Sequence, residues 1–149
     1  MFLDFKKLAV IFAGIFISAS GYAAGIDALD AGEYKLKSGD KELCAESFEI
    51  SAKQLKSSNL IIAGVYMFEL KSGNTETVSD LDAHCVFKEK SLREDTGVTE
   101  TKLKRVNQEL CSGKVKSLTT SQATITRGEI RVLHKVDNAE PYECVWKKK

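Results

Sequence analysis

Short turns built around glycine recur along this chain, and they constrain its fold more than any other feature of the sequence. They lie at Ser38-Gly39-Asp40, Ser72-Gly73-Asn74, Asp95-Thr96-Gly97, Ser112-Gly113 and Arg127-Gly128. Two strands that run parallel need a crossover of about a dozen residues or more, and these turns leave no room for one. The chain is therefore predicted to be all-β, with consecutive antiparallel strands.

The clearest strand register lies near the C-terminus, on either side of Arg127-Gly128. Apolar side chains fall on one face when the strands pair as Ile125–Ile130, Ala123–Val132 and Ser121–His134. A second hairpin around residues 138–141 is expected to follow, with Pro141 at the start of the last strand because proline cannot donate to a ladder. Its predicted pairs are Val136–Tyr142, His134–Cys144 and Val132–Trp146.

Counting in this way gives about eight strands. The predicted ranges are 31–38, 41–51, 59–70, 76–91, 99–111, 114–126, 129–137 and 141–148. We expect a bulge or a close backbone approach at Gly64 and an interruption at residues 79–82. An antiparallel meander of this size suits an up-and-down β-barrel, because closure removes exposed edges, and a β-sandwich is the alternative.

Residues 99–111 fit two interpretations. Leu103, Val106 and Leu110 have the spacing of a helix face, and Gly113 would suit the end of a helix. We favour a strand because Ser112-Gly113 also makes a two-residue hairpin and the neighbouring segments are strands.

The N-terminal residues 1–23 have the pattern of a secretory signal peptide. Lys6 and Lys7 precede the apolar run 8–17, and the small residues Gly21 and Ala23 form a cleavage site. The run is shorter than the roughly 20 residues of a membrane-spanning helix, so no stable membrane span is expected. The prediction is an exported protein, periplasmic or secreted, with residues 24–149 forming a single domain.

Export places the four cysteines in an oxidising compartment, where they are expected to pair. The closed meander brings the second strand close to the last and the fourth beside the fifth, which favours Cys44–Cys144 with Cys85–Cys111. The alternative, Cys44–Cys85 with Cys111–Cys144, would suit a sandwich. No cysteine has the spacing of a zinc site.

The predicted first strand opens with Gly32-Glu33-Tyr34, which resembles the Gly-x-Trp start of the lipocalin and calycin group, with tyrosine in the aromatic place. The outline of a signal peptide, about eight strands and one or two disulfides is also similar to small exported bacterial barrel proteins, including lysozyme inhibitors. The resemblance implies a β-barrel and carries no functional residue over to this chain.

Composition and motifs exclude several functions. The net charge of +1 gives no electrostatic footprint for nucleic acid. No catalytic set, nucleotide motif or metal pattern occurs, so we predict neither an enzyme nor a cofactor. The prediction is a non-enzymatic binding protein that holds a small apolar ligand in the barrel, with an inhibitor or protein-interaction module as the alternative. The side chains expected to line the cavity are Tyr34, Tyr66, Phe68, His134, Tyr142 and Trp146.

Overall fold

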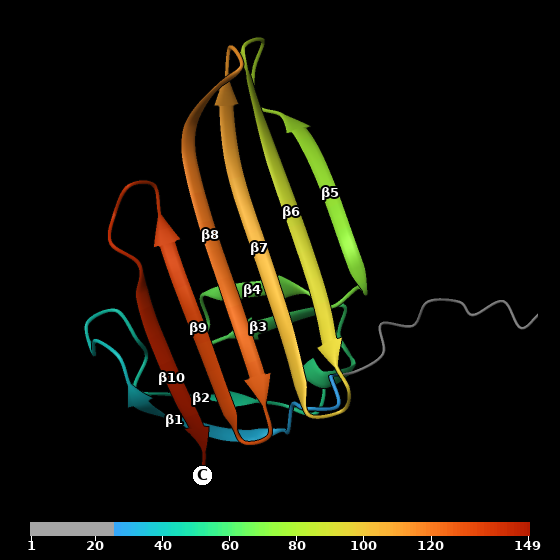
Figure 1. The fold of residues 1–149 in the computed structure, drawn as a ribbon, viewed down its shortest axis with the longest axis vertical. Coiled ribbons are helices and arrows are strands. Elements are labelled where there is room, and N and C mark those ends of the chain that lie inside the picture. The colour runs from blue at the N-terminus through green and yellow to red at the C-terminus, as the bar shows by residue number, and fades with distance from the viewer. Residues whose placement is uncertain (1–25) are drawn as a thin grey trace, which may run out of the picture.

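The computed structural model describes residues 26–149, so the predicted signal peptide at 1–23 lies outside the described residues. The described chain is all-β, with ten strands and one short 3₁₀ helix (Figure 1). The elements are β1 (Gly32–Ser38), β2 (Ser47–Ile50), η1 (Gln54–Lys56), β3 (Asn59–Ile62), β4 (Tyr66–Glu69), β5 (Gly73–Asp80), β6 (Cys85–Thr96), β7 (Glu100–Cys111), β8 (Lys114–Thr126), β9 (Glu129–Val136) and β10 (Tyr142–Lys148).

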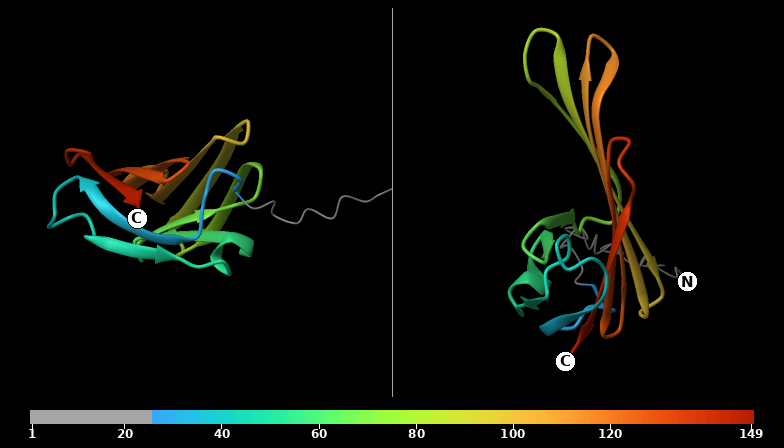
Figure 2. Two further views of the ribbon diagram at one scale, coloured as in Figure 1. Left: turned by 90° about the horizontal axis from the view of Figure 1, so that it is seen from below. Right: turned by 90° about the vertical axis from the view of Figure 1, so that its left-hand side faces the viewer.

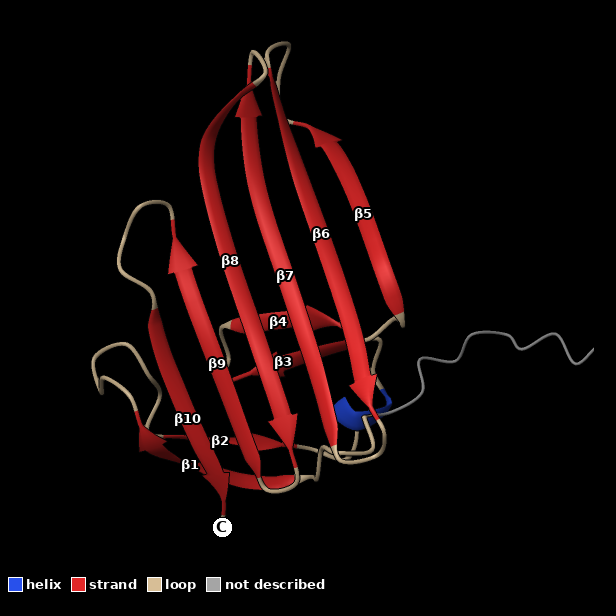
Figure 3. Cartoon of the chain, in the orientation of Figure 1, coloured by secondary structure: helices blue, strands red, loops and turns tan. Residues whose placement is uncertain are grey.

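Eight strands form one antiparallel sheet in the order β2-β1-β10-β9-β8-β7-β6-β5, and β3 and β4 form a separate hairpin. This confirms the predicted antiparallel meander. The sheet order ends at β2 and β5, and no ladder joins these two strands, so a closed barrel is not found. Figure 3 shows the long strands of the sheet in front and the β3–β4 hairpin crossing behind them.

Three of the predicted strands differ from the observed ones. The range 41–51 is a strand only at its end, in β2, because the chain turns where the Asp40 carbonyl accepts the N–H groups of Leu43 and Cys44. The range 59–70 divides into β3 and β4, because Ala63 and Gly64 both have positive φ and make a tight hairpin turn in place of the expected bulge. The range 76–91 divides into β5 and β6 at residues 81–84, two residues further along the chain than the interruption expected at 79–82.

The other strand predictions are confirmed, including the choice of strand for residues 99–111, which fall in β7. The register of β8 and β9 is the predicted one, with Ile125 opposite Ile130. The register of β9 and β10 is shifted by two residues, so that Tyr142 lies opposite His134. The predicted pairs of that hairpin, Val136–Tyr142, His134–Cys144 and Val132–Trp146, are therefore wrong. The cause is a longer connecting loop, because Asp137 keeps bonding to β8 through the backbone of Leu118.

Both predicted disulfides are present. Cys44 is joined to Cys144, with 5.7 Å between their Cα atoms, and Cys85 is joined to Cys111, with 4.1 Å between theirs. The first bridge ties the loop before β2 to β10 inside the core. The second joins directly opposite residues of β6 and β7. Two disulfides indicate an oxidising environment of the extracellular type.

The molecule has two layers in its lower part, and in its upper part the sheet is the single layer (Figure 2, right). Below, β1, β2, β3 and β4 lie across from β6–β10 and enclose the core. The inner face is the side of the sheet that carries the core residues Leu103, Ala123, Ile125, Val132 and Trp146.

The upper part of the sheet is an arm with no cover on either face. We define the distal arm as residues 77–89 and 107–119, which form the upper halves of β5–β8 and their two tip turns. Not one residue of these two ranges is buried. The arm is held by the uninterrupted β6–β7 ladder and by the Cys85–Cys111 bridge near its tip.

Candidate functional site

The structure divides the six predicted cavity residues into two sets. Tyr34, Phe68 and Trp146 are fully buried core residues, and the Trp146 indole N–H donates to the Ala45 carbonyl at 2.7 Å. Burial raises the pKa of the Tyr34 hydroxyl, which donates to the Asp30 carbonyl. These three side chains therefore have a structural role, as expected of aromatic residues that fill an interior.

The other three predicted residues, Tyr66, His134 and Tyr142, line one pocket. It has a volume of about 360 Å³ and lies on the inner face, where the β3–β4 hairpin ends and the distal arm begins. We call it the rim pocket. Its lining residues are Leu43, Val65, Tyr66, Met67, Arg105, Asn107, Thr119, Ser121, His134 and Tyr142.

An aromatic cluster forms the floor of the rim pocket. The Tyr66 and Tyr142 hydroxyls share a hydrogen bond of 2.9 Å, and the His134 ring lies 5.5 Å and 5.4 Å from their ring centroids. His134 is held from β8 by a 2.8 Å hydrogen bond between its Nδ1 and the Ser121 Oγ. The three rings are thus fixed in position before any ligand arrives.

Burial sets the protonation of this cluster. Desolvation, together with the hydrogen bond and the field of Tyr142, raises the pKa of the Tyr66 phenol above its ordinary value. Desolvation lowers the pKa of His134. At neutral pH His134 is therefore an uncharged imidazole, and Tyr66 is an uncharged phenol.

Arg105 and Asn107 on β7 supply the polar side of the pocket. The Arg105 guanidinium donates to the Glu89 carboxylate at 2.6 Å and to the Met67 carbonyl at 3.2 Å. The Arg105 Nε and the Asn107 Oδ1 are buried atoms with no hydrogen-bond partner among residues 26–149. Buried polar atoms rarely stay unpaired, and both atoms belong to residues that line the rim pocket.

The sequence analysis missed Arg105 and Asn107. A signal existed, because residues 103, 105 and 107 share one face of a strand and Leu103 is apolar, as residues that face a core usually are. Reading the alternation onward from Leu103 places both polar side chains on the inner face, where the structure has them.

A second arginine fixes the hairpin that covers the core. Arg93 on β6 is buried, and its guanidinium donates to the Leu70 carbonyl at 2.7 Å and to the Asp95 carboxylate at 3.0 Å. Arg93 and Arg105 thus hold the β4 strand and its end at two carbonyls, Met67 and Leu70. These two arginines therefore fix where the β3–β4 hairpin lies on the inner face, next to the rim pocket.

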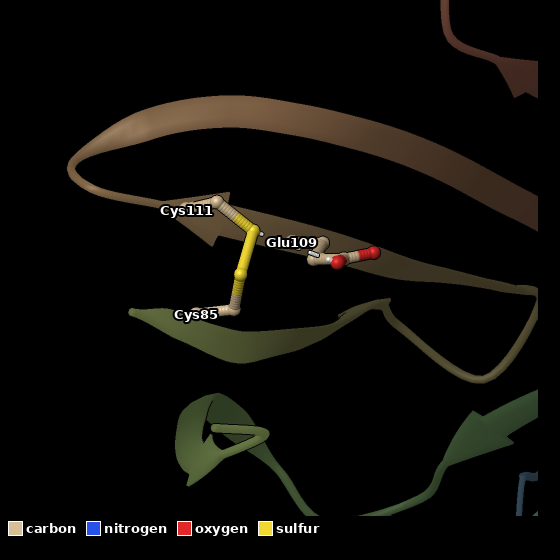
Figure 4. Close-up of side chains that lie close together, drawn as sticks. All are labelled: Cys85, Glu109 and Cys111. Atoms are coloured by element: carbon tan, nitrogen blue, oxygen red, sulfur yellow. Dashed lines mark hydrogen bonds between the residues drawn. A yellow bond between two sulfur atoms is a disulfide. The ribbon is translucent and has the colours of Figure 1, made fainter. Parts of the chain in front are cut away.

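A possible metal-binding group lies on the distal arm, where Glu109 sits beside the Cys85–Cys111 bridge (Figure 4). Both sulfur atoms are used in the disulfide, so they offer no thiolate to a metal ion. The Glu109 carboxylate pairs instead with Lys116 at 3.1 Å. At the tip turn beside the disulfide, the Asp82 carboxylate accepts the N–H groups of His84 and Cys85 and so stabilises the turn.

Other hollows differ from the rim pocket in their lining. A groove of about 410 Å³ crosses the outer face beside β5, and Lys90, Lys104 and Glu76 line it together with apolar side chains. Lys90 and Glu76 pair with each other there at 3.1 Å. Ser91, whose Oγ is a buried atom without a partner among residues 26–149, also lines this groove, but no aromatic residue does. The rim pocket differs from it in combining fixed aromatic rings with residues that carry unpaired buried atoms.

Comparisons with protein-family models, with curated proteins and with solved structures found no match to this chain. Within residues 26–149, no helix is long and apolar enough to cross a membrane.

Proposed function

We propose that this chain is an exported, non-enzymatic binding protein that holds a small uncharged ligand in the rim pocket. The observation that carries the proposal is the convergence of three fixed aromatic side chains and two unpaired buried polar atoms on one pocket of about 360 Å³. Pockets for small molecules are of this size and usually combine an apolar lining with a few placed polar groups.

The charge balance of the pocket supports an uncharged ligand. Arg105 is neutralised by Glu89, and burial keeps His134 neutral at neutral pH. The Asn107 Oδ1 is an acceptor without a donor, so the ligand should carry a hydroxyl or an N–H group. The rings of Tyr66 and Tyr142 suit an apolar face of the same molecule. The ligand is thus expected to be amphiphilic, whereas the sequence favoured an apolar one.

The proposal also includes the location of the protein and its resemblance to lipocalins. The signal-peptide pattern of residues 1–23 and the two disulfides support a periplasmic or secreted protein. The lipocalin-like start at Gly32-Glu33-Tyr34 supports a ligand-binding role by analogy. The proposal is the same whether the lower part is classed as a partly closed barrel or as a sandwich, because the pocket lies at its open end.

The test is native mass spectrometry of the protein purified from its own host, with both disulfides intact. We expect a small retained mass on the wild type that is lost in Asn107→Leu, which removes the unpaired acceptor. The matched control is Gln108→Leu on the opposite face of the same strand, which should keep the mass. A mass retained equally by both variants would place the ligand elsewhere and defeat the proposal.

One observation favours the alternative, an inhibitor or interaction module that acts on an extracellular or periplasmic protein. The distal arm exposes Val78, Leu81, Val115 and Leu118, and Val115 is 54% exposed. In the same experiment, a retained mass of protein size that is lost in Val115→Asp and kept in Asn107→Leu would support this function.

A further inference from the structure

The outer edge of β5 is a long unpaired strand edge. β5 pairs with β6 through all eight of its residues without a register shift, and within residues 26–149 no strand lies on its other side (Figure 1). Every second residue of β5 therefore points its backbone N–H and C=O away from the sheet. The opposite edge, β2, has only four residues.

β5 lacks most of the features that usually protect a sheet edge. Natural edge strands carry charged side chains, above all lysine, or proline or a bulge, or are covered by a loop. Of these, β5 has only the acidic residues Glu76 and Asp80, and Glu76 is paired with Lys90 at 3.1 Å. The sequence of β5, GNTETVSD, has no lysine, arginine or proline, its ladder is regular, and all but one of its residues are exposed. Such an edge is a template for another strand.

We propose that β5 pairs with β5 of a second copy of this chain, antiparallel and about a two-fold axis at Thr77. A two-fold interface requires that one strand be complementary to itself. With Thr77 opposite Thr77, residues 74–80 all find a partner. The further opposite pairs are Glu76–Val78, Thr75–Ser79 and Asn74–Asp80.

Charge selects this register over its neighbours. Centring the pair on Glu76 would place Glu76 directly opposite its own copy, and centring it on Val78 would place Glu76 opposite Asp80. Like charges in directly opposite positions destabilise a strand pair, whereas pairs of threonine and serine stabilise it. The Thr77 register leaves no two acidic side chains directly opposite one another and aligns hydroxyl groups on the inner face.

The shape of the molecule leaves room for this pairing. In the Thr77 register, Gly73 of one copy lies beside residue 81 of the other, so the two-layered lower parts lie at opposite ends of the joined sheet. The arm between them is a single layer (Figure 2, right). The β3–β4 hairpin reaches β5 at its lower end, where the Thr75 hydroxyl donates to the Glu69 carboxylate at 2.6 Å. That contact lies on the inner face, whereas a second copy would pair along the edge of the sheet.

Sedimentation velocity of the disulfide-intact chain over a wide concentration range tests the proposal. We expect a dimer whose fraction rises with concentration. Thr77→Lys and Thr77→Glu should each be monomeric, because each places like charges opposite one another, and an equal mixture of the two should form a heterodimer. Ser47→Lys on the β2 edge is the matched control and should behave as the wild type does.

A cysteine variant gives a positive readout that does not depend on losing the dimer. Directly opposite residues of antiparallel strands lie within disulfide reach, so Thr77→Cys should form a covalent dimer on mild oxidation, and Ser47→Cys should not. A wild type that stays monomeric at every concentration would overturn the proposal. A dimer that Ser47→Lys abolishes and Thr77→Lys does not would overturn it too, as would a mixture of the two charged variants that stays monomeric.

Discussion

The two disulfides close loops of very different length, and this predicts how much each contributes to the free energy of unfolding. Cys44–Cys144 spans 100 residues and Cys85–Cys111 spans 26. In the chain-entropy model, the longer loop stabilises by about 4.7 kcal/mol and the shorter by about 3.5 kcal/mol at 25 °C. The bridges should therefore differ by about 1 kcal/mol from loop length alone.

Burial widens that difference. Cys44 and Cys144 are both buried in the core, whereas Cys85 and Cys111 lie half-buried on the uncovered arm. Replacing the buried pair by alanine leaves a cavity, and replacing the half-buried pair leaves none of consequence. We expect Cys44→Ala/Cys144→Ala to lower the free energy of unfolding by about 5 kcal/mol or more, and Cys85→Ala/Cys111→Ala by about 3–4 kcal/mol.

Urea unfolding under non-reducing conditions measures both values. Trp146 is the single tryptophan of the chain and is fully buried, so its fluorescence reports on the core. Far-UV circular dichroism follows the whole sheet, and coincidence of the two curves checks that unfolding is two-state. If removing the arm bridge costs as much as removing the core bridge, the reasoning from loop length and burial is wrong.

Three further predictions follow from the pocket and the turns. Burial lowers the pKa of His134 below its ordinary value of 6.5, so between the folded-state pKa and 6.5 the unfolded chain binds more protons, and the free energy of unfolding falls as the pH drops below about 6.5. Urea unfolding across pH should show that His134→Gln reduces this loss, with His84→Gln on an exposed turn as the control. Tyr142→Phe leaves the more deeply buried Tyr66 hydroxyl unpaired and should cost about 1–2 kcal/mol in thermal unfolding, more than Tyr66→Phe, while the double variant should cost less than the sum. Gly39→Ala should destabilise far more than Gly97→Ala. Both positions have positive φ, but only at Gly39 would a Cβ meet other atoms, 2.7 Å from the Cys44 Sγ and 2.8 Å from the Glu143 carbonyl oxygen. Equal thermal midpoints of the two variants would contradict this.

The features that the sequence predicted well are those fixed by local chemistry or by strand parity. The β8–β9 register follows from two apolar residues that flank a glycine turn, and the β9–β10 pairing, though shifted by two residues, keeps every side chain on the predicted face. The Cys85–Cys111 pairing followed from neighbouring strands, and each of these features needs only a few residues of context. The Cys44–Cys144 pairing is also correct, although it was predicted from a closed barrel that the structure does not show.

The features that the sequence did not predict depend on unusual local conformations or on distant contacts. Ala63 takes a positive φ in the β3–β4 turn, which alanine seldom does, so the pattern of 59–70 looked like one continuous strand. Arg93 and Arg105 look like surface residues in sequence, and only the position of β4 shows that they donate to its carbonyls. The open upper sheet has no local signal of its own.

The position of the rim pocket can nevertheless be read from one change of polarity. On β7 the inner face changes from Leu103 to Arg105, and on β8 it changes from Ala123 to Ser121, at the same level of the sheet. A cover extended past that level would have to remove the rest of the Arg105 side chain, which is 19% exposed, from water, and an apolar hairpin offers it no further hydrogen-bond partner. The β3–β4 hairpin therefore stops where the inner face becomes polar. The side chains at that boundary, half covered and partly unpaired, line the rim pocket in which we propose that a ligand binds.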